Sequence, residues 1–246
     1  MKSQILLKSV TKNYDAHTRA LNNISLKISK GEWVSIIGPS GSGKTTLLNL
    51  ISGLDTPSSG TININDTEIT SLNEKLLTKF RRENVGLIFQ QYHLIPYLNA
   101  LENVTIAQYF HGMVDEKRAQ VALERVGLGH RLSHRPAQLS GGEQQRVCIS
   151  RALINEPSII FADEPTGNLD IKNGEVIIKI LKELVNEGHT LVLVTHNMNI
   201  AKQGERIIEL VDGELSKDSL EAKDAPLAGV ISEYIRNEKT HGKNLP

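Results

Sequence analysis

Apolar and polar residues follow two different patterns along this chain. Near the N-terminus they alternate, at residues 5–7 and again at 20–28, and the alternation predicts an antiparallel sheet with one exposed face. Uninterrupted apolar runs come later, at residues 33–37, 85–89, 159–162 and 190–194. Such runs are typical of strands in a parallel sheet that is covered on both faces.

Helical patterns predict most of the remaining elements. The expected helices cover residues 72–82, 101–110, 115–126, 141–153 and 173–187. The last of these lies between two apolar runs, so it predicts a crossover within the parallel sheet. Residues 60–65 predict an edge strand, and residues 206–210 with 214–215 predict a hairpin that turns at Asp212 and Gly213. The expected fold is an α/β core with an antiparallel β subdomain and an α-helical subdomain inserted at about residues 91–155.

A glycine-rich motif joins the apolar run at 33–37 to a helical segment. Residues 38–45, Gly-Pro-Ser-Gly-Ser-Gly-Lys-Thr, fill every fixed position of the pattern G-x-x-x-x-G-K-[ST]. In the order strand, turn and helix, this motif binds the phosphates of a nucleoside triphosphate: Lys44 reaches the β- and γ-phosphates and the Thr45 hydroxyl binds Mg²⁺. The alternative is a glycine turn that binds nothing. The motif predicts a P-loop NTPase (RecA-like) core.

Composition narrows the possible partners and compartments. The 246 residues carry 28 basic and 28 acidic side chains, so the chain lacks the basic excess typical of nucleic-acid binding. Cys148 is the single cysteine, which excludes an intramolecular disulfide, indicates a reducing compartment and is expected to be a buried thiol. No apolar stretch approaches the roughly 20 residues that span a bilayer. We therefore expect a soluble protein that reaches a membrane only through a partner.

Polar residues at the ends of the apolar runs are candidates for catalysis. Asp163 and Glu164 follow the run at 159–162, where α/β sheets place ligands. Asp163 is suited to Mg²⁺, and Glu164 to deprotonating the water that attacks a γ-phosphate; the alternative is that both acids cap the next helix. His196 could contact the γ-phosphate, and the Gln90 amide suits Mg²⁺ or the attacking water. Each of the last two residues is a weak signal by itself.

A second predicted anion site begins at Ser140. Ser140 and Glu143 form a capping box, so a helix starts here, and Gly141 and Gly142 expose its first N–H groups. One ATP has one γ-phosphate, and the motif at 38–45 already binds it. We therefore expect two chains to pack head to tail, with each helix terminus facing the other chain's ATP.

With these motifs in this order, the chain resembles the nucleotide-binding subunits of ABC transporters from about residue 3 to residue 217. The resemblance identifies residues 38–45 as the Walker A motif, 159–164 as the Walker B motif with the catalytic glutamate, and 139–144 as the signature motif. It identifies Gln90 as the Q-loop glutamine, His196 as the switch histidine, and residues 168–170 as the D-loop. Tyr14 matches the aromatic residue that stacks on adenine, with Ala20 near the ribose.

The resemblance implies ATP and Mg²⁺ as cofactors and a homodimer that forms on ATP binding. Catalysis is expected from Lys44, Gln90, Glu164 and His196, and Mg²⁺ binding from Thr45, Gln90 and Asp163. The residues expected to bind nucleotide are Tyr14, Ala20, Gly38, Pro39, Ser40, Gly41, Ser42, Gly43, Lys44, Thr45 and Thr46. Those expected to reach the partner chain's ATP are Ser140, Gly141, Gly142, Glu143 and Asp170.

Residues 89–96, 100–104 and 162–170 are similar to the MacB/LolD branch of the family. That branch implies an ATP-hydrolysing subunit of a membrane export or mechanotransmission complex, bound to the cytoplasmic face of the cell membrane through an integral membrane permease. Cargo of the antimicrobial peptide, drug or lipoprotein type is implied. An apolar cluster is expected to contact the permease, although a core-facing role for half of it is an equal alternative; its members are Tyr92, Leu94, Ile95, Tyr97 and Leu98.

Two other functions stay open from the sequence. One is an ABC ATPase that acts away from membranes, against which the segment 90–104 argues; the other is a regulatory ATPase resembling the FtsE–FtsX pair. Two departures from the family pattern are Asn197, where an aspartate usually follows the histidine, and residues 148–150 (Cys-Ile-Ser), which replace a more alanine-rich helix. The expected domains are an ATPase at 1–217 and a tail at 218–246, with a helical pattern at 227–235 and no indicated role.

Overall fold

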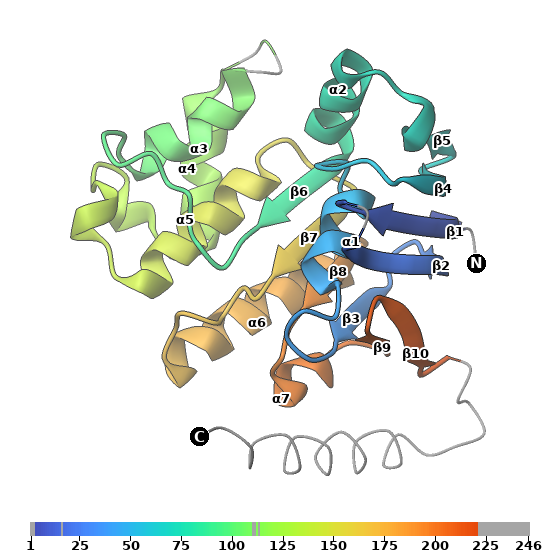
Figure 1. The fold of residues 1–246 in the computed structure, drawn as a ribbon. Helices are drawn as coiled ribbons and strands as arrows, with labels where there is room; N and C mark the ends of the chain where they lie inside the picture. The colour runs from blue at the N-terminus through green and yellow to red at the C-terminus, as the bar shows by residue number, and fades with distance from the viewer. Residues whose placement is uncertain (1–2, 16, 110–111, 113, 221–246) are drawn as a thin grey trace.

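The computed structural model describes residues 3–15, 17–109, 112 and 114–220. These residues form two sheets and a set of helices, and helix α1 (Lys44–Ile51) packs between the two sheets (Figure 1). The tail pattern at 227–235 and Phe110, the expected end of one helix, lie outside the described residues.

The first sheet is antiparallel, as the alternating pattern predicts. Its strand order is β2-β1-β4-β5. The strands are β1 (Ser3–Asn13), β2 (Arg19–Ser29), β4 (Ser59–Ile64) and β5 (Thr67–Glu68). In β2 the side chains of Ile24, Leu26 and Ile28 are buried, while those of Ser25 and Lys27 between them are exposed. One face of this sheet therefore covers the core and the other meets water.

The second sheet has six strands in the order β10-β9-β3-β8-β7-β6. The strands are β3 (Trp33–Ile37), β6 (Val85–Ile88), β7 (Ile159–Asp163), β8 (Thr190–Val194), β9 (Arg206–Val211) and β10 (Glu214–Asp218). Neighbouring strands run parallel except β10, which pairs antiparallel with β9 across the turn at Asp212 and Gly213. The predicted hairpin and the predicted parallel strands are both present.

Both faces of the parallel strands are covered, which explains why their sequences are uniformly apolar. In β3, Val34 and Ile36 belong to the core that contains α1 and the antiparallel sheet. Trp33 points to the opposite face, where it packs in a second core with Leu181 of helix α6 (Ile171–Asn186). Helix α6 connects β7 to β8 as the predicted crossover.

A third core lies among helices on the side of the molecule away from the antiparallel sheet (Figure 1). It joins α3 (Ala100–Tyr109), α4 (Glu116–Arg125) and α5 (Gly141–Leu153) through buried residues such as Val104, Leu123 and Val147. Ile149, also on α5, instead packs against the six-stranded sheet. Helix α5 therefore contacts both the helical region and the sheet.

The remaining helices are short or peripheral. They are α2 (Glu74–Asn84), α7 (Met198–Ala201) and the 3₁₀ turns η1 (Ile69–Ser71), η2 (Gly129–Arg131) and η3 (Pro136–Gln138). The pattern did not predict α7 or the two-residue strand β5, because four residues and two residues are too few to establish a period.

Two predictions about strands require correction. The strand at 60–65 is not at an edge: β4 pairs with β1 on one side and with β5 on the other. The strand at 85–89 ends earlier, at Ile88, so Gln90 lies two residues beyond β6 in an irregular segment. For β4 the reason is the two-residue partner strand β5, and for β6 it is the irregular segment that follows Ile88. Periodicity in the sequence shows neither feature.

Candidate functional site

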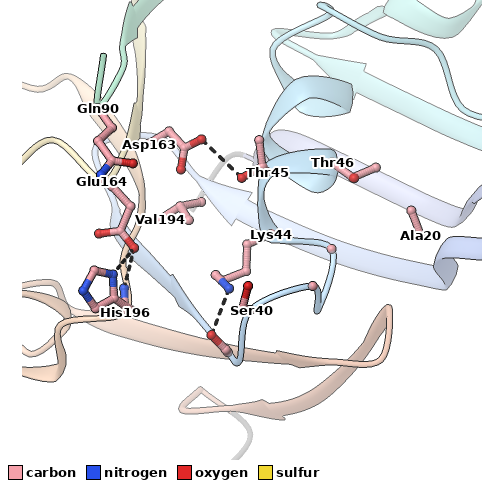
Figure 2. Close-up of a pocket in the computed structure, with 13 residues that line it drawn as sticks. Ala20, Ser40, Lys44, Thr45, Thr46, Gln90, Asp163, Glu164, Val194 and His196 are labelled. Carbon is pink, nitrogen blue, oxygen red and sulfur yellow. Dashed lines mark hydrogen bonds and ion pairs between the residues drawn. The ribbon is translucent and has the colours of Figure 1, made fainter. Parts of the chain in front are cut away.

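Strands β3, β6, β7 and β8 end at the same edge of the six-stranded sheet, and a cavity of about 440 Å³ lies there (Figure 2). Parallel strands place their carboxyl ends together, which is where α/β proteins bind ligands. The lining residues are Ala20, Gly38, Ser40, Gly41, Gly43, Lys44, Thr45, Thr46, Gln90, Asp163, Glu164, Val194 and His196. All four expected catalytic residues and all three expected Mg²⁺ ligands are in this set.

The loop between β3 and α1 folds around the cavity. Gly43 has φ 98°, and a Cβ there would lie 2.5 Å from the Ala20 carbonyl oxygen, so only glycine fits this position. Lys44 begins α1, and its Nζ donates to the carbonyl oxygens of Gly38 at 2.9 Å and Pro39 at 2.7 Å. The loop thus presents an ammonium group at the N-terminus of a helix, an arrangement that attracts phosphate. Pro39 and Ser42 support this loop without lining the cavity.

The Lys44 ammonium and the Asp163 carboxylate are both partly desolvated. Burial lowers the pKa of Lys44, an effect that the nearby Glu164 and Asp163 charges oppose. Burial also raises the pKa of Asp163, and the hydrogen bond from the Thr45 hydroxyl to its Oδ2, at 3.3 Å, opposes that rise. A hydroxyl and a carboxylate at this separation supply the oxygen ligands that Mg²⁺ requires.

Glu164 is held by residues that follow β8 (Figure 2). Its Oε1 accepts from the His196 backbone N–H and contacts His196 Nδ1, both at 2.7 Å, and its Oε2 accepts from the Thr195 hydroxyl at 3.1 Å. Glu164 has φ 44°, an unusual backbone conformation for a residue other than glycine, and its N–H donates to the Val194 carbonyl. Strain of this kind is concentrated at functional sites.

The structure decides between the two interpretations of Asp163 and Glu164. The alternative in which both acids cap the next helix does not hold, because Asp170 caps α6 and Glu164 faces the cavity. No pattern in the sequence singled out Thr195. Its position between an apolar strand and His196 is the signal that could have indicated it, since the polar residue directly after a buried parallel strand reaches the same sheet edge.

Gln90 and Asn168 hold each other at the rim of the cavity. The Gln90 Nε2 donates to Asn168 Oδ1 at 3.3 Å, and Asn168 Nδ2 donates to the Gln90 carbonyl at 3.0 Å. This pairing fixes the segment after β6 against the segment after β7. The sequence placed both residues in motifs but did not predict that they bond to each other.

Tyr14 lies beside the cavity rather than in its lining. Its ring is 56% exposed, and its Oη is 3.4 Å from Thr46 Oγ1 on α1. The Lys12 Nζ lies 5.0 Å from the ring centroid and is itself held by Asp55 Oδ1 at 2.7 Å. An exposed ring beside the phosphate-binding loop is suited to stacking on a base. No local pattern in the sequence indicated Lys12, because its contact with Asp55 joins distant parts of the chain.

The second predicted anion site is distant from this cavity within the chain. Ser140 caps α5: its Oγ accepts from the Glu143 N–H at 3.3 Å, and its own N–H donates to Glu143 Oε2 at 2.8 Å. These hydrogen bonds lower the pKa of Glu143, and Arg131 adds an ion pair at 3.0 Å. Neither Ser140 nor Glu143 lines the cavity described above. The predicted capping box is therefore present, and it lies outside the lining of the chain's own cavity.

The glycines of this segment have a second reason for their presence. A Cβ at Gly142 would lie 2.4 Å from Asn173 Oδ1, and one at Gly141 would lie 2.9 Å from the Tyr92 Oη. Asn173 is in turn bonded to Asp170 Oδ2 at 2.7 Å. The sequence suggests glycine here to expose N–H groups; the structure shows that Gly142 also packs directly against the Asn173 side chain and that Gly141 lies near the Tyr92 hydroxyl.

The apolar cluster after Gln90 divides into exposed and half-buried members. Tyr97 is 81% and Ile95 36% exposed, whereas Leu94 packs against the helical core. Tyr92 and Leu98 are half-buried. The buried side chain of Asn103, on α3, holds this loop through the N–H of Ile95 and several of its carbonyls. The cluster thus contains both surface and core positions, in line with the alternative left open above.

Two further observations concern the described part of the chain. It contains no helix with the length and apolar character needed to cross a bilayer. Nor do its histidine, cysteine, aspartate and glutamate side chains gather in groups of three or more that could hold a metal ion. A metal at the cavity would therefore depend on a mixed set of oxygen ligands such as Thr45 and Asp163.

Comparison with known proteins agrees with this geometry. Residues 21–167 match the family model described as ABC transporter. The chain is 51% identical over 218 residues to the ABC transporter ATP-binding protein MJ1508 of Methanocaldococcus jannaschii, covering 85% of this chain and 96% of that protein. It is 49% identical over 222 residues to the macrolide export ATP-binding/permease protein MacB of Campylobacter jejuni, covering 89% of this chain. The match spans only 34% of that MacB protein's length.

A solved structure is similar over most of its length. It is a dimer of the ATP-binding cassette MJ0796, from the same Methanocaldococcus species, in a post-hydrolysis state with ADP and Pi. The TM-score is 0.81 at 48% identity, and the match covers 87% of this chain and 97% of that one. The predicted P-loop fold, with its antiparallel and parallel sheets, is confirmed. The chain belongs to the ABC transporter family, as an ATP-binding cassette.

Proposed function

We propose that this chain is the ATP-binding and ATP-hydrolysing subunit of a membrane ABC complex of the MacB/LolD type. The observation that carries the proposal is the separation of the two predicted anion sites. One surrounds the cavity with Lys44, Asp163 and Glu164, and the other, at Ser140, lies outside it. The cassette MJ0796 that this chain resembles is itself dimeric with ADP and Pi. In our proposal each ATP is bound between two copies of this chain.

The cavity residues fit an Mg²⁺–ATP complex. Bound Mg²⁺ would neutralise phosphate charge, with Thr45, Asp163 and Gln90 as its protein ligands or as holders of its waters. The remaining nucleotide-binding residues are those of the loop at 38–45, with Thr46, Ala20 and the Tyr14 ring around the rest of the nucleotide. The Lys44 ammonium, whose pKa is lowered by burial, regains favourable electrostatics when a phosphate approaches.

Glu164 is proposed as the general base. A carboxylate has about four lone-pair sites, and three of those on Glu164 face the Thr195 hydroxyl, the His196 N–H and His196 Nδ1. The remaining site can accept the proton of the attacking water. His196 is more exposed than Glu164 and reaches from the carboxylate toward the cavity, which suits a residue that also contacts the γ-phosphate.

Ser140, Gly141, Gly142, Glu143 and Asp170 are proposed to act on the ATP of the partner copy. A membrane permease, in the same complex, is proposed to contact the exposed members of the cluster at 92–98, and it would place the chain on the cytoplasmic face of the membrane. The division into an ATPase at 1–217, with helices inserted at about 91–155, and a tail at 218–246 remains a proposal. Drug, peptide or lipoprotein cargo follows from the branch and is proposed on that ground.

The test is ATP-dependent dimerisation. Glu164→Gln should retain ATP, because the substitution keeps the shape of the side chain while removing the base. With ATP and Mg²⁺ it should run as a dimer by size-exclusion chromatography with light scattering, and with ADP it should run as a monomer. The same variant with Lys44→Ala should stay monomeric with either nucleotide. A Glu164→Gln variant that binds ATP and stays monomeric would contradict the proposal.

A further inference from the structure

Helix α5 holds the segment after Gln90 through two side chains on one of its faces. The Cys148 thiol donates to the Tyr92 carbonyl at 2.8 Å. Arg151, three residues further along the helix, donates from Nη2 to the same carbonyl at 3.0 Å and from Nη1 to the His93 carbonyl at 2.7 Å. Residues at i and i+3 lie on the same face of a helix, so both can reach one short segment.

The two donors suit their positions chemically. The guanidinium group has a rigid fork of N–H groups, which allows Arg151 to bind two consecutive carbonyls at once. His93 has φ 46°, a conformation that non-glycine residues seldom adopt, and it lies between the bonded carbonyl of Tyr92 and its own. Burial raises the pKa of Cys148 to about 12, so the thiol stays protonated and remains a donor at neutral pH.

Tyr92 extends from these bonds to the other end of the helix. Its carbonyl contacts Cys148 and Arg151 in the second half of α5, while its Oη lies against Gly141 at the helix start. Gln145, between these points, also donates from Nε2 to the Phe89 carbonyl at 3.3 Å. The segment 89–93 is therefore bonded to the middle and the second half of α5, the helix that Ser140 caps.

We propose that Cys148 and Arg151 are positioning residues that lock the segment 89–93 to α5 and so hold the Ser140 tip where it can bind the partner copy's ATP. This inference rests on the proposed function. It also accounts for Cys148, one of the residues that departs from the family pattern. A displacement of the segment would be transmitted to the helix tip, because the Tyr92 carbonyl is bonded to the second half of α5 and the Tyr92 Oη packs near Gly141 at its start.

The lock is tested in the Glu164→Gln protein with ATP and Mg²⁺. Arg151→Met should weaken dimerisation by roughly tenfold, about 1.4 kcal/mol, because it removes two of the four hydrogen bonds from α5 to the segment. Cys148→Ala should weaken it by a few fold, and Cys148→Ser, which keeps a donor, should restore most of the loss. The affinity of the monomer for a fluorescent ATP analogue should stay within about twofold in every variant, because Tyr92 and His93 lie outside the cavity lining and Gln90 keeps its hydrogen bonds with Asn168.

The control is Arg118→Met in the same helical region. Arg118 forms an exposed ion pair with Glu156 at 2.6 Å and has no contact with the segment, so dimerisation should be unchanged. If Arg151→Met is folded and dimerises as tightly as the parent, the inference is wrong. If Arg151→Met does not fold, the two Cys148 variants decide. Equal dimerisation of Cys148→Ala and Cys148→Ser would then overturn the lock. A parent that stays monomeric overturns the proposed function, and the lock with it.

Discussion

The start of α1 and the start of α5 offer the same chemistry in different surroundings. Each presents backbone N–H groups at a helix N-terminus, where anions bind. Around α1 the chain supplies a cavity, a lysine and two carboxylates of its own. At α5 the chain supplies only the cap made by Ser140 and Glu143, with Arg131 beside it.

Charge distinguishes the two starts as well. Near α1, burial shifts the pKa of Lys44 down and that of Asp163 up, so both groups are held in an environment that disfavours their charges. Near α5, hydrogen bonds from Ser140 shift the pKa of Glu143 down, so that carboxylate is already satisfied. Groups held where burial disfavours their charge are candidates for a ligand site, whereas the Glu143 carboxylate already has hydrogen-bond and ion-pair partners. The difference supports the assignment of one site to binding and the other to contact with a partner.

The strongest test of the cavity side is loss of the proposed base. Glu164→Gln should lower the rate of ATP hydrolysis by roughly 10²–10⁴, the usual contribution of a positioned general base. Single-turnover hydrolysis measures the effect, and Glu183→Gln, on the exposed side of α6, should hydrolyse ATP normally. Near-normal turnover in Glu164→Gln would remove this residue from the base role.

The body of α5 should behave differently from its exposed tip. An ordinary thiol has a pKa of 9.0, and burial raises that of Cys148 to about 12. A higher pKa means less thiolate at a given pH, so alkylation at pH 8 should be roughly 10³-fold slower than for a free thiol and should accelerate only as the pH approaches 12. Labelling followed by mass spectrometry is unambiguous because this is the single cysteine. The same thiol should react at the ordinary rate in denaturant, and rapid labelling of the native chain would show that the helix body is open.

Bulk at the tip of α5 should affect the partner and spare the cavity. Ser140→Arg should weaken ATP-dependent dimerisation of the Glu164→Gln protein by roughly 30-fold or more, because a lost contact to a buried charge costs about 2 kcal/mol or more. Binding of ATP to the monomer should persist. Ser71→Arg, at an exposed turn, is the matched control for charge and size. Loss of ATP binding by the Ser140→Arg monomer would mean that the tip serves its own chain.

The smallest expected effect concerns the base-binding side of the cavity. Lys12→Met removes the cation 5.0 Å from the Tyr14 ring centroid. If Lys12 fixes and polarises that ring, ATP affinity should fall by roughly two- to fivefold, the equivalent of about 0.5–1 kcal/mol. Inorganic tripolyphosphate, which has no base, should bind as before. Lys8→Met, at an exposed position of the same strand, should leave both affinities unchanged, and equal losses for ATP and tripolyphosphate would contradict a role for Lys12 at the base.

Much of the fold follows directly from local patterns. The alternating N-terminal residues form the antiparallel sheet, and the uniformly apolar runs form β3, β6, β7 and β8. The helix at 141–153 has the predicted bounds because its capping box is a local signal that needs no distant partner. The pattern missed very short elements, gave β4 a wrong place because a neighbour decided it, and put α2 at 72–82 instead of 74–84.

The residues of the site were partly predictable for the same reason. The motif at 38–45 and the acids at 163 and 164 could be named because strand, turn and helix succeed one another along the chain. The sequence could not assign the partners of Thr195, Gln90 and Lys12. Those partners, Glu164, Asn168 and Asp55, are distant from them in sequence.

The sequence by itself determined which strands are buried, where the phosphate-binding loop lies and where α5 begins, because each of these depends on neighbours within a few residues. Only the tertiary structure decided that Glu164 is held by two residues from the end of β8 and that the Tyr92 carbonyl is bonded to Cys148 and Arg151 of α5. It also decided that Gly142 packs directly against the Asn173 side chain. These contacts depend on where separate strands and helices come to rest against one another, and close packing, which has no period in the sequence, sets that arrangement.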